Sequence, residues 1–424
     1  MQSKSKVCIV SDAIPPIHSG AGLSAMKLAY RLHKKEMLGL VLTGTEQTFG
    51  EAGKIIMQGE TDEKFLDTIH RVPSSGLSAR TTGRNPILFF AGLVKVAIRI
   101  PFTLFRERKK FGVLHCFSPT WFSLFAILSA KMMRKRVVLE ITRLDGDDPG
   151  YIAHHDRFRI LYQRRLVQYF LADVLVCNSP ALHDRCLQSR SISEERLRLI
   201  PRAFSRKLCQ NNGKRVEYRR KLCIPDDALA LLFIGGINYR KGIHILVDAV
   251  IPLTKEFPQL RIYIIGPDGK TASDRTYSKE IRQKVQKHNL SGHIRFTGFL
   301  ADVYDYYKAA DIFLLPSISE GLPNVIIEAM ACGNVVLMND LPGISDFLIS
   351  NGEDGFILSN KPASYAMKIR ELANDPDTRK RISDAARAKV SAIFDEDLID
   401  RDYLNLYGQL SGLESMKAHP GPAR

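Results

Sequence analysis

The chain has 424 residues, of which 45% are hydrophobic and 25% are charged. This length is too great for one hydrophobic core and predicts two domains of about 200 residues each. The proportions are those of a folded globular protein. A membrane-spanning helix is excluded, because the most apolar region, residues 86–105, is interrupted by Lys95, Arg99 and Pro101, and a span needs about 20 apolar residues.

The positive charge lies in the amino-terminal half. Residues 1–220 contain 37 Lys and Arg against 19 Asp and Glu, a net of +18, whereas residues 221–424 contain 24 against 26, a net of −2. A basic half beside a neutral half indicates an anionic partner for one domain, either a membrane surface, an acidic lipid-linked substrate or nucleic acid. We expect no nucleic acid, because no nucleic-acid-binding module accompanies the charge. A basic surface that serves only solubility is the remaining alternative.

The seven cysteines show no CxxC spacing, and several of them lie in apolar runs. This pattern predicts reduced thiols in a cytoplasmic protein. Residues 1–6 lead directly into the apolar run at residues 7–10, so we expect no signal peptide.

Strands and helices alternate through the first half of the chain. We expect strands at residues 7–10, 113–116, 137–141, 174–178 and 197–200, and helices at residues 23–32, 86–108, 121–134 and 154–171. The first strand is followed by a loop that contains Gly20 and Gly22, which would let the backbone approach a phosphate at the start of the next helix. Such alternation predicts a doubly wound domain.

Residues 86–108 combine aromatic and aliphatic side chains with four cations. The pattern fits a helix that lies in the plane of a membrane, and it fits equally a helix packed on its own sheet with a solvated basic edge. Further basic clusters at residues 106–110 and 131–136 lie beside apolar segments. Their repetition favours peripheral attachment of this domain to an anionic membrane surface.

The second half repeats the alternation. Residues 206–228 are basic and irregular, which predicts a linker. Strands are expected at residues 230–234, 261–265, 294–297, 312–315 and 335–338, with helices between them and on to about residue 410. We therefore expect domains at residues 1–205 and 229–398, followed by residues 399–424 with the last helix and a loose tail.

The most informative stretch is residues 312–333, IFLLPSISEGLPNVIIEAMACG. An apolar strand ends at Pro316 and a Ser-rich loop follows. Pro323 suits the first position of a helix, and Gly333 suits its left-handed cap. Ligands of open α/β sheets bind where strands end and helices begin, and the free N–H groups of a helix start favour a phosphate.

Two carboxylates flank this point, Glu320 on the loop and Glu328 within the helix, with seven residues between them. Glu328 lies roughly 7 to 8 Å along the helix axis from Pro323, within range of a ribose attached to a phosphate. In isolation, such a pair is more often two solvated surface acids. The surrounding residues favour function, because PSISEGLPNVIIEAMACG resembles the Glu-x7-Glu motif of the family 4 retaining glycosyltransferases, also called glycosyl transferases group 1.

The resemblance implies a GT-B fold, in which two doubly wound Rossmann-like domains face each other across a cleft and the last helix crosses back to the first domain. It implies a retaining, metal-independent hexosyltransferase that uses no cofactor beyond its nucleoside-diphosphate-sugar co-substrate. The acceptor would be a glycan, a lipid-linked molecule or another acceptor in cell-surface polysaccharide or glycolipid synthesis. A sugar-nucleotide epimerase of the same fold and a non-catalytic nucleotide-sugar-binding module are the alternatives.

The resemblance also implies a set of site residues. Glu320 would contact the donor sugar and support the leaving-group side, and Glu328 would hold the ribose hydroxyls. Lys241 lies between a strand and a helix, so its ammonium can reach a pyrophosphate at the helix start, and it joins Glu320 as an expected catalytic residue. The expected donor-binding residues are Gly20, Gly236, Lys241, Gly298, Phe299, Glu320, Gly321, Leu322, Asn324 and Glu328.

The chain departs from the family pattern in its amino-terminal glycine loop, where the usual pair of adjacent glycines is Ser19-Gly20, and at two further places. The family's Gly-Arg-x4-Lys-Gly segment is GGINYRKG here, so Gly236 replaces an arginine and Arg240 or another residue must supply its charge. The family's histidine after the strand at residues 137–141 is absent, since Thr142 and Arg143 stand at that place.

Acceptor contacts are assigned to His115, Arg143, Asp145 and Asp147. His115 stands beside an apolar strand, where a histidine is more often a satisfied core residue. The acidic pattern at residues 145–147 is not taken as a metal site, because Gly146 and Pro149 indicate a turn.

Overall fold

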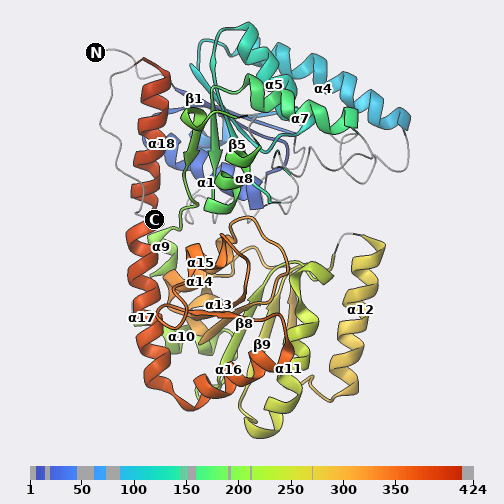
Figure 1. Cartoon of the computed structure of the whole chain (residues 1–424), viewed down its shortest axis with the longest axis vertical. Coiled ribbons are helices and arrows are strands. Elements are labelled where there is room, and N and C mark those ends of the chain that lie inside the picture. Colours follow the sequence, from blue (N-terminus) through green and yellow to red (C-terminus); the bar gives the residue numbers. More distant parts are fainter. Residues whose placement is uncertain are drawn as a thin grey trace. The chain divides into compact units, whose positions relative to one another are not determined.

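The structure is a computed structural model that describes residues 6–14, 20–44, 62–72, 86–144, 147, 149, 159–189, 192–210, 213–269 and 271–412. The chain divides into two compact units. The first contains Met1–Arg202 and Asp397–Arg424, and the second contains Ala203–Glu396. Each is an α/β domain with a parallel sheet at its centre (Figure 1).

The first unit has a seven-stranded parallel sheet in the order β3-β2-β1-β4-β5-β6-β7. Its strands are β1 (Val7–Ser11), β2 (Leu38–Thr43), β3 (Ile69–Arg71), β4 (Val113–Phe117), β5 (Arg136–Ile141), β6 (Val174–Cys177) and β7 (Leu197–Leu199). Strands β1, β4 and β6 are buried along their whole length, which is why their sequences are continuous apolar runs.

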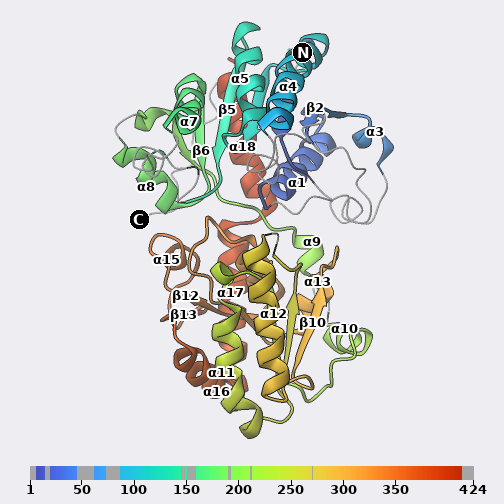
Figure 2. The same ribbon diagram turned by 90° about the vertical axis from the view of Figure 1, so that its right-hand side faces the viewer.

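Helices cover both faces of this sheet (Figure 2). They are α1 (Gly20–Lys34), α3 (Glu63–Leu66), α4 (Pro86–Arg106), α5 (Trp121–Met132), α7 (Arg159–Leu171), α8 (Pro180–Gln188), the 3-10 helix η3 (Glu194–Arg196) and α18 (Glu396–Leu410). Alternate residues of a strand face opposite sides. Leu114 and Cys116 therefore share a core with Val96 and Ile100 of α4, whereas His115 faces α18.

Buried polar contacts hold α18 in the first unit. The hydroxyl of Tyr407 lies 2.7 Å from Nδ1 of His115, and the hydroxyl of Tyr403 donates to Oε2 of Glu140 at 3.2 Å. Burial, and next the charge of Arg202, lower the pKa of His115 to about 3, so its imidazole is neutral near pH 7. The last helix is thus packed on strands β4 and β5.

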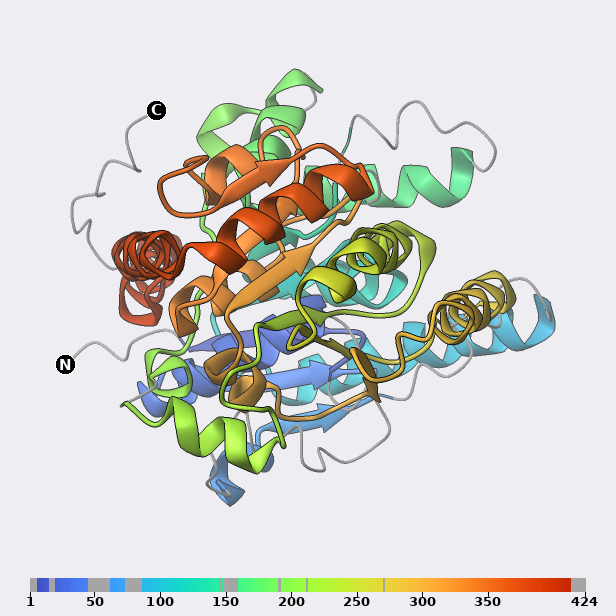
Figure 3. The same ribbon diagram turned by 90° about the horizontal axis from the view of Figure 1, so that it is seen from below.

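The second unit has a six-stranded parallel sheet in the order β10-β9-β8-β11-β12-β13. Its strands are β8 (Ala230–Ile234), β9 (Arg261–Ile265), β10 (Ile294–Gly298), β11 (Ile312–Leu315), β12 (Val335–Asn339) and β13 (Phe356–Leu358). Its helices are α9 (Arg206–Cys209), α10 (Arg215–Lys221), the 3-10 helix η4 (Tyr239–Lys241), α11 (Ile243–Glu256), α12 (Ala272–Lys287), α13 (Tyr304–Ala309), α14 (Asn324–Cys332), α15 (Ser345–Leu348), α16 (Pro362–Asn374) and α17 (Pro376–Ile393). Helix α11 packs against α16 and α14 against α17, so the sheet is covered on both faces (Figure 3).

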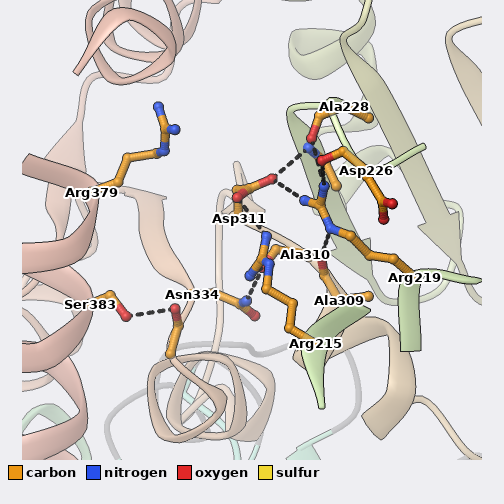
Figure 4. Close-up of polar contacts among 12 residues, drawn as sticks. Arg215, Arg219, Asp226, Ala228, Ala309, Ala310, Asp311, Asn334, Arg379 and Ser383 are labelled. Carbon is orange, nitrogen blue, oxygen red and sulfur yellow. Dashed lines mark hydrogen bonds and ion pairs between the residues drawn. The ribbon is translucent and has the colours of Figure 1, made fainter. Parts of the chain in front are cut away.

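The expected linker at residues 206–228 differs from the structure, because α9 and α10 are helices of the second unit. Arg215 and Arg219 of α10 each bind one carboxylate oxygen of Asp311, at 2.6 and 2.7 Å (Figure 4). The guanidinium of Arg219 also donates to the carbonyl oxygens of Ala309 and Ala228. The basic residues of this stretch therefore anchor a helix to the amino ends of strands, and their partner lies about ninety residues away in the sequence.

Both sheets reverse their winding direction at one point. In the first unit the reversal falls between β1 and β4, and in the second it falls between β8 and β11. Adjacent strands at such a point send their following helices to opposite faces, which opens a crevice beyond the carboxyl ends of the strands. These two strand ends are the places where each unit is expected to bind a ligand.

Candidate functional site

The loops after β8 and β11 meet at the reversal point of the second unit. Lys241 lies in the first loop and Glu320 in the second, and Nζ of Lys241 donates to Oε1 of Glu320 at 2.5 Å. The main chain joins the same loops, since the N–H of Ile318 donates to the carbonyl oxygen of Arg240 at 2.9 Å. The two expected catalytic residues are therefore direct neighbours.

Gly242 makes this approach possible. It has a left-handed φ of +69° and an added Cβ would lie 2.0 Å from the carbonyl oxygen of Pro316, at the end of β11. A side chain at this position would push the Lys241 loop away from that strand. Asn238 fixes the other side of the loop, because its Oδ1 accepts from the N–H of Lys241 at 3.2 Å.

Glu320 is buried between cations. Nη1 of Arg240 lies 3.3 Å from its Oε2 and also donates to the carbonyl oxygen of Ser319. Burial alone would raise the pKa of Glu320, but the charges of Lys241 and then Arg240 outweigh it and hold the pKa below its usual value. The ion pair is therefore fully formed near neutral pH, and its stabilisation is lost only as the pH falls through this lowered pKa.

Helix α14 begins immediately after the Glu320 loop. Asn324 is its first residue, Pro323 is the N-cap and Gly333 is the C-cap with a φ of +87°, so the expected boundaries agree within one residue. The N-cap, Pro323, supplies no side-chain hydrogen bond, and the backbone N–H groups of a helix start favour an anionic ligand. Gly321 and Leu322 lie in the preceding turn, close to these groups.

Glu328 lies one turn further into α14 and is held by two tyrosines. The hydroxyl of Tyr304 donates to its Oε1 at 3.2 Å and that of Tyr307 to its Oε2 at 3.3 Å. Both tyrosines come from α13 and are buried. They fix the carboxylate of Glu328 in one orientation, and sequence reasoning missed them because aromatic residues on a short helix resemble ordinary core.

The remaining donor-side residues lie at the end of β10, after β8 and at the start of α1. Gly298 ends β10 with a φ of +73°, and Phe299, which follows it, is 48% exposed. An added Cβ at Gly236 would make only ordinary contacts, 3.5 Å from Nδ2 of Asn238 and 3.9 Å from the carbonyl oxygen of Pro267. Gly20 begins α1 of the first unit, and an added Cβ there would meet nothing within 4 Å.

The acceptor-side residues separate into two groups. Thr142 donates to Oδ2 of Asp147 at 3.0 Å, and Nη2 of Arg143 lies 3.3 Å from Oδ1 of Asp147. Arg143 and Asp147 thus lie together after β5, while Asp145 lies outside the described residues. The assignment of His115 is corrected by its position: it is 0% exposed under α18, so it belongs to the core and no acceptor reaches it.

Asp12 is a residue that sequence reasoning missed. It directly follows β1, and burial raises the pKa of its carboxyl to about 6, with Asp147 adding to the rise and Arg143 opposing it. Asp12 follows β1 and the Arg143 and Asp147 pair follows β5, so all three lie along the carboxyl edge of the first sheet. Nothing in the sequence beyond its place after a strand distinguished it from the other acids of the chain.

The chain is similar in sequence to known glycosyltransferases. The D-inositol 3-phosphate glycosyltransferase of Streptomyces coelicolor is 31% identical over 259 residues, which cover 57% of this chain and 55% of that protein. The lipopolysaccharide core biosynthesis glycosyltransferase LpsE of Rhizobium meliloti is 27% identical over 246 residues, 58% of this chain and 67% of LpsE. The chain spans about half the length of most of the curated relatives it matches.

Solved structures match over almost the whole chain. HepE of Anabaena, crystallised with UDP-glucose, has a TM-score of 0.72 at 20% identity, covering 96% of this chain and 100% of HepE. The fold is GT-B, built from two doubly wound parallel units, which confirms the expected fold class. Residues 214–389 match the model of the family Glycosyl transferases group 1, so this domain of the chain belongs to that family, as its Glu-x7-Glu motif had indicated.

Proposed function

We propose that the chain is a retaining glycosyltransferase that moves a sugar from a nucleoside-diphosphate-sugar to a glycan or lipid-linked acceptor. The observation that supports this most is the ion pair of Lys241 and Glu320, held at the reversal point of the second sheet and beside the start of α14. A cation, the backbone N–H groups of a helix start and a carboxylate are thereby collected at one strand end. This combination suits a diphosphate that carries a sugar.

In the proposed reaction, the bond between the anomeric carbon and the diphosphate oxygen breaks, and a bond from that carbon to the acceptor oxygen forms. The acceptor proton passes to a phosphate oxygen, and the nucleoside diphosphate departs. Lys241 has three N–H donors and gives one to Glu320, so it can donate to the departing diphosphate as well. The chain's own cations and the N–H groups of α14, without a metal, would stabilise the developing charge.

Glu320 is proposed to face the sugar and Glu328 the ribose. The hydroxyls of Tyr304 and Tyr307 fix the orientation of the Glu328 carboxylate. A fixed carboxylate suits the acceptance of hydrogen bonds from the two hydroxyls of a ribose. Because HepE was crystallised with UDP-glucose, UDP is the first nucleotide to test. The names of the relatives favour an inositol phosphate or a lipopolysaccharide core as models for the acceptor, in cell-surface glycan synthesis. We further propose a cytoplasmic location and attachment of the basic first domain to an anionic membrane surface.

The experiment that tests this function is a thermal-shift screen with UDP, GDP, ADP and their sugar conjugates, followed by product analysis. A transferase is expected to bind one nucleotide family and to release the diphosphate only with an acceptor present. Turnover of the donor to an isomer without acceptor would indicate an epimerase. Binding without turnover of any kind would indicate a binding module.

Arg240 is expected to supply the cation that the family places at the position of Gly236. Its guanidinium already lies 3.3 Å from Glu320, beside Lys241. We expect Arg240→Ala to lower kcat/KM about 10- to 100-fold, the value of one lost charge-assisted contact. Gly236→Arg in the same chain should restore most of the loss, because the position has room for a Cβ. Steady-state transfer rates of the single and double variants check this, and wild-type activity of Arg240→Ala would contradict it.

A further inference from the structure

The outer side of α4 is a continuous apolar stripe. Its members recur every three to four residues and are between 43% and 78% exposed: Ile87, Phe90, Val94, Ile98, Phe102 and Phe105. This spacing places them on one side of a 21-residue helix. Exposed apolar side chains are normally scattered singly on a protein, and a row of six is a marker of an interaction surface.

Packing within the first unit does not account for this stripe. The core side of α4 is a second apolar stripe, Val96, Ile100 and Leu104, which is fully buried against the sheet. A helix that only covers its sheet needs one apolar side, with polar residues opposite. Here the opposite side is the exposed apolar row, so α4 has two apolar sides. Figure 2 shows α4 as an outer helix of the first unit.

Cations border the stripe. At about 100° per residue, Lys95, Arg99 and Arg106 fall together on one flank of it. Residues 86–110 contain six Lys and Arg against the single acid Glu107, and Glu107 lies on the buried side, paired with Arg106 and Lys110. The guanidinium of Arg108 lies 4.2 Å from the ring centre of Phe105, so aromatic surface and positive charge meet at the end of the helix.

Exposed apolar and basic residues continue onto the neighbouring helix α5. It packs along α4, and its last residue, Met132, is 86% exposed. Arg134 and Arg136 follow at once and are exposed. The apolar and basic surface therefore covers the outer side of two adjacent helices of one layer.

We propose that α4 docks on an anionic lipid bilayer, lying in its plane with the apolar stripe inserted between headgroups and the flanking cations on lipid phosphates. The proposal rests on the proposed membrane attachment of the first domain and names its surface. None of the helices in the described part of the chain meets the length and hydropathy of a membrane span. A second copy of the chain is a poorer partner, because it would bring a surface of like charge against these cations, whereas anionic headgroups complement them.

The test is cosedimentation of the full chain with phosphatidylcholine vesicles, with and without phosphatidylglycerol, at low salt. Ile98→Glu/Phe102→Glu changes two exposed side chains in the middle of the stripe and leaves the core side intact. The matched control is Val216→Glu/Met367→Glu, which changes two exposed apolar residues on helices of the second unit. A charge variant, Lys95→Ala/Arg99→Ala, tests the flank without introducing acids. Circular dichroism melting and the nucleotide-induced thermal shift report folding and donor binding of each variant.

We expect wild type and the control to bind phosphatidylglycerol vesicles, and the stripe variant to partition roughly tenfold less or weaker still. The charge variant should lose binding that depends on phosphatidylglycerol.

Absence of wild-type binding, or binding of the stripe variant equal to wild type, would overturn the proposal. So would a wild-type dimer in sedimentation velocity that the stripe variant dissociates, since the stripe would then be a self-interface. If vesicle binding fails while nucleotide binding and transfer persist, only the docking surface is rejected; if transfer fails while vesicle binding persists, only the enzyme function is.

Discussion

Replacing Lys241 by alanine is expected to lower kcat by roughly 10²- to 10³-fold, the usual cost of removing one preorganised group that stabilises developing charge. Lys241 is the nearest cation to Glu320, at 2.5 Å, and only 13% of its side chain is exposed. Water cannot take its place as readily as at an exposed residue. Single-turnover and steady-state transfer assays with saturating donor measure the effect on kcat separately from donor binding.

Two further variants separate a catalytic role of Lys241 from a structural one. Lys255→Ala removes an exposed lysine from the neighbouring helix α11 and should leave activity unchanged. Lys241→Ala leaves Glu320 buried with less positive charge, so the pKa of that carboxyl rises and the folded state loses stability. Lys241→Ala/Glu320→Gln removes the buried charge and should regain melting temperature but no activity. An activity loss in Lys241→Ala that matches its loss of folded protein would reject the catalytic role.

Glu320→Gln is expected to reduce transfer about 10²-fold or more, because the amide keeps the size of the side chain and loses its charge. The carboxylate holds Lys241 and Arg240 at the strand end, and a neutral amide accepts from them more weakly. The affinity for the nucleoside diphosphate should not fall, since a negative charge beside the phosphates is removed.

This combination, slower turnover with undiminished diphosphate affinity, distinguishes a role in the reaction from a role in binding. The measurement pairs transfer rates with calorimetric affinities for wild type and Glu320→Gln. Glu371→Gln, on the exposed surface of α16, is the matched control. Unchanged sugar transfer in Glu320→Gln would remove the catalytic assignment.

Much of the fold could be predicted because its signals are local. Buried parallel strands are short apolar runs, and the α14 boundaries depend on Pro323 and Gly333, which lie within the same eleven residues. The proximity of Lys241 and Glu320 could also be inferred, since each follows a strand and the two strands are neighbours in a doubly wound sheet. The close approach of the Lys241 loop to β11, which Gly242 permits, could not be predicted from the sequence. The atom that a side chain at Gly242 would meet is the carbonyl oxygen of Pro316, in a distant part of the chain.

Features that depend on contacts between residues far apart in the sequence could not be predicted from local sequence patterns. The basic residues of α10 resemble a solvated linker until Asp311 is placed between Arg215 and Arg219. His115 resembles an acceptor ligand until Tyr407, from the other end of the chain, covers it. The sequence left two alternatives open for α4, and the exposure of its outer stripe is the observation on which the proposed membrane-facing helix rests.

The central claim is that a diphosphate binds where β8 and β11 end, between the Lys241 loop and the start of α14. Isothermal titration calorimetry with the nucleoside diphosphate that gives the largest thermal shift tests it most directly, on wild type and on Arg240→Ala/Lys241→Ala. We predict saturable binding to wild type and an affinity at least about tenfold weaker in the double variant, because two charge-assisted contacts are lost. Equal affinity in the two proteins, with the double variant folded, would contradict the claim.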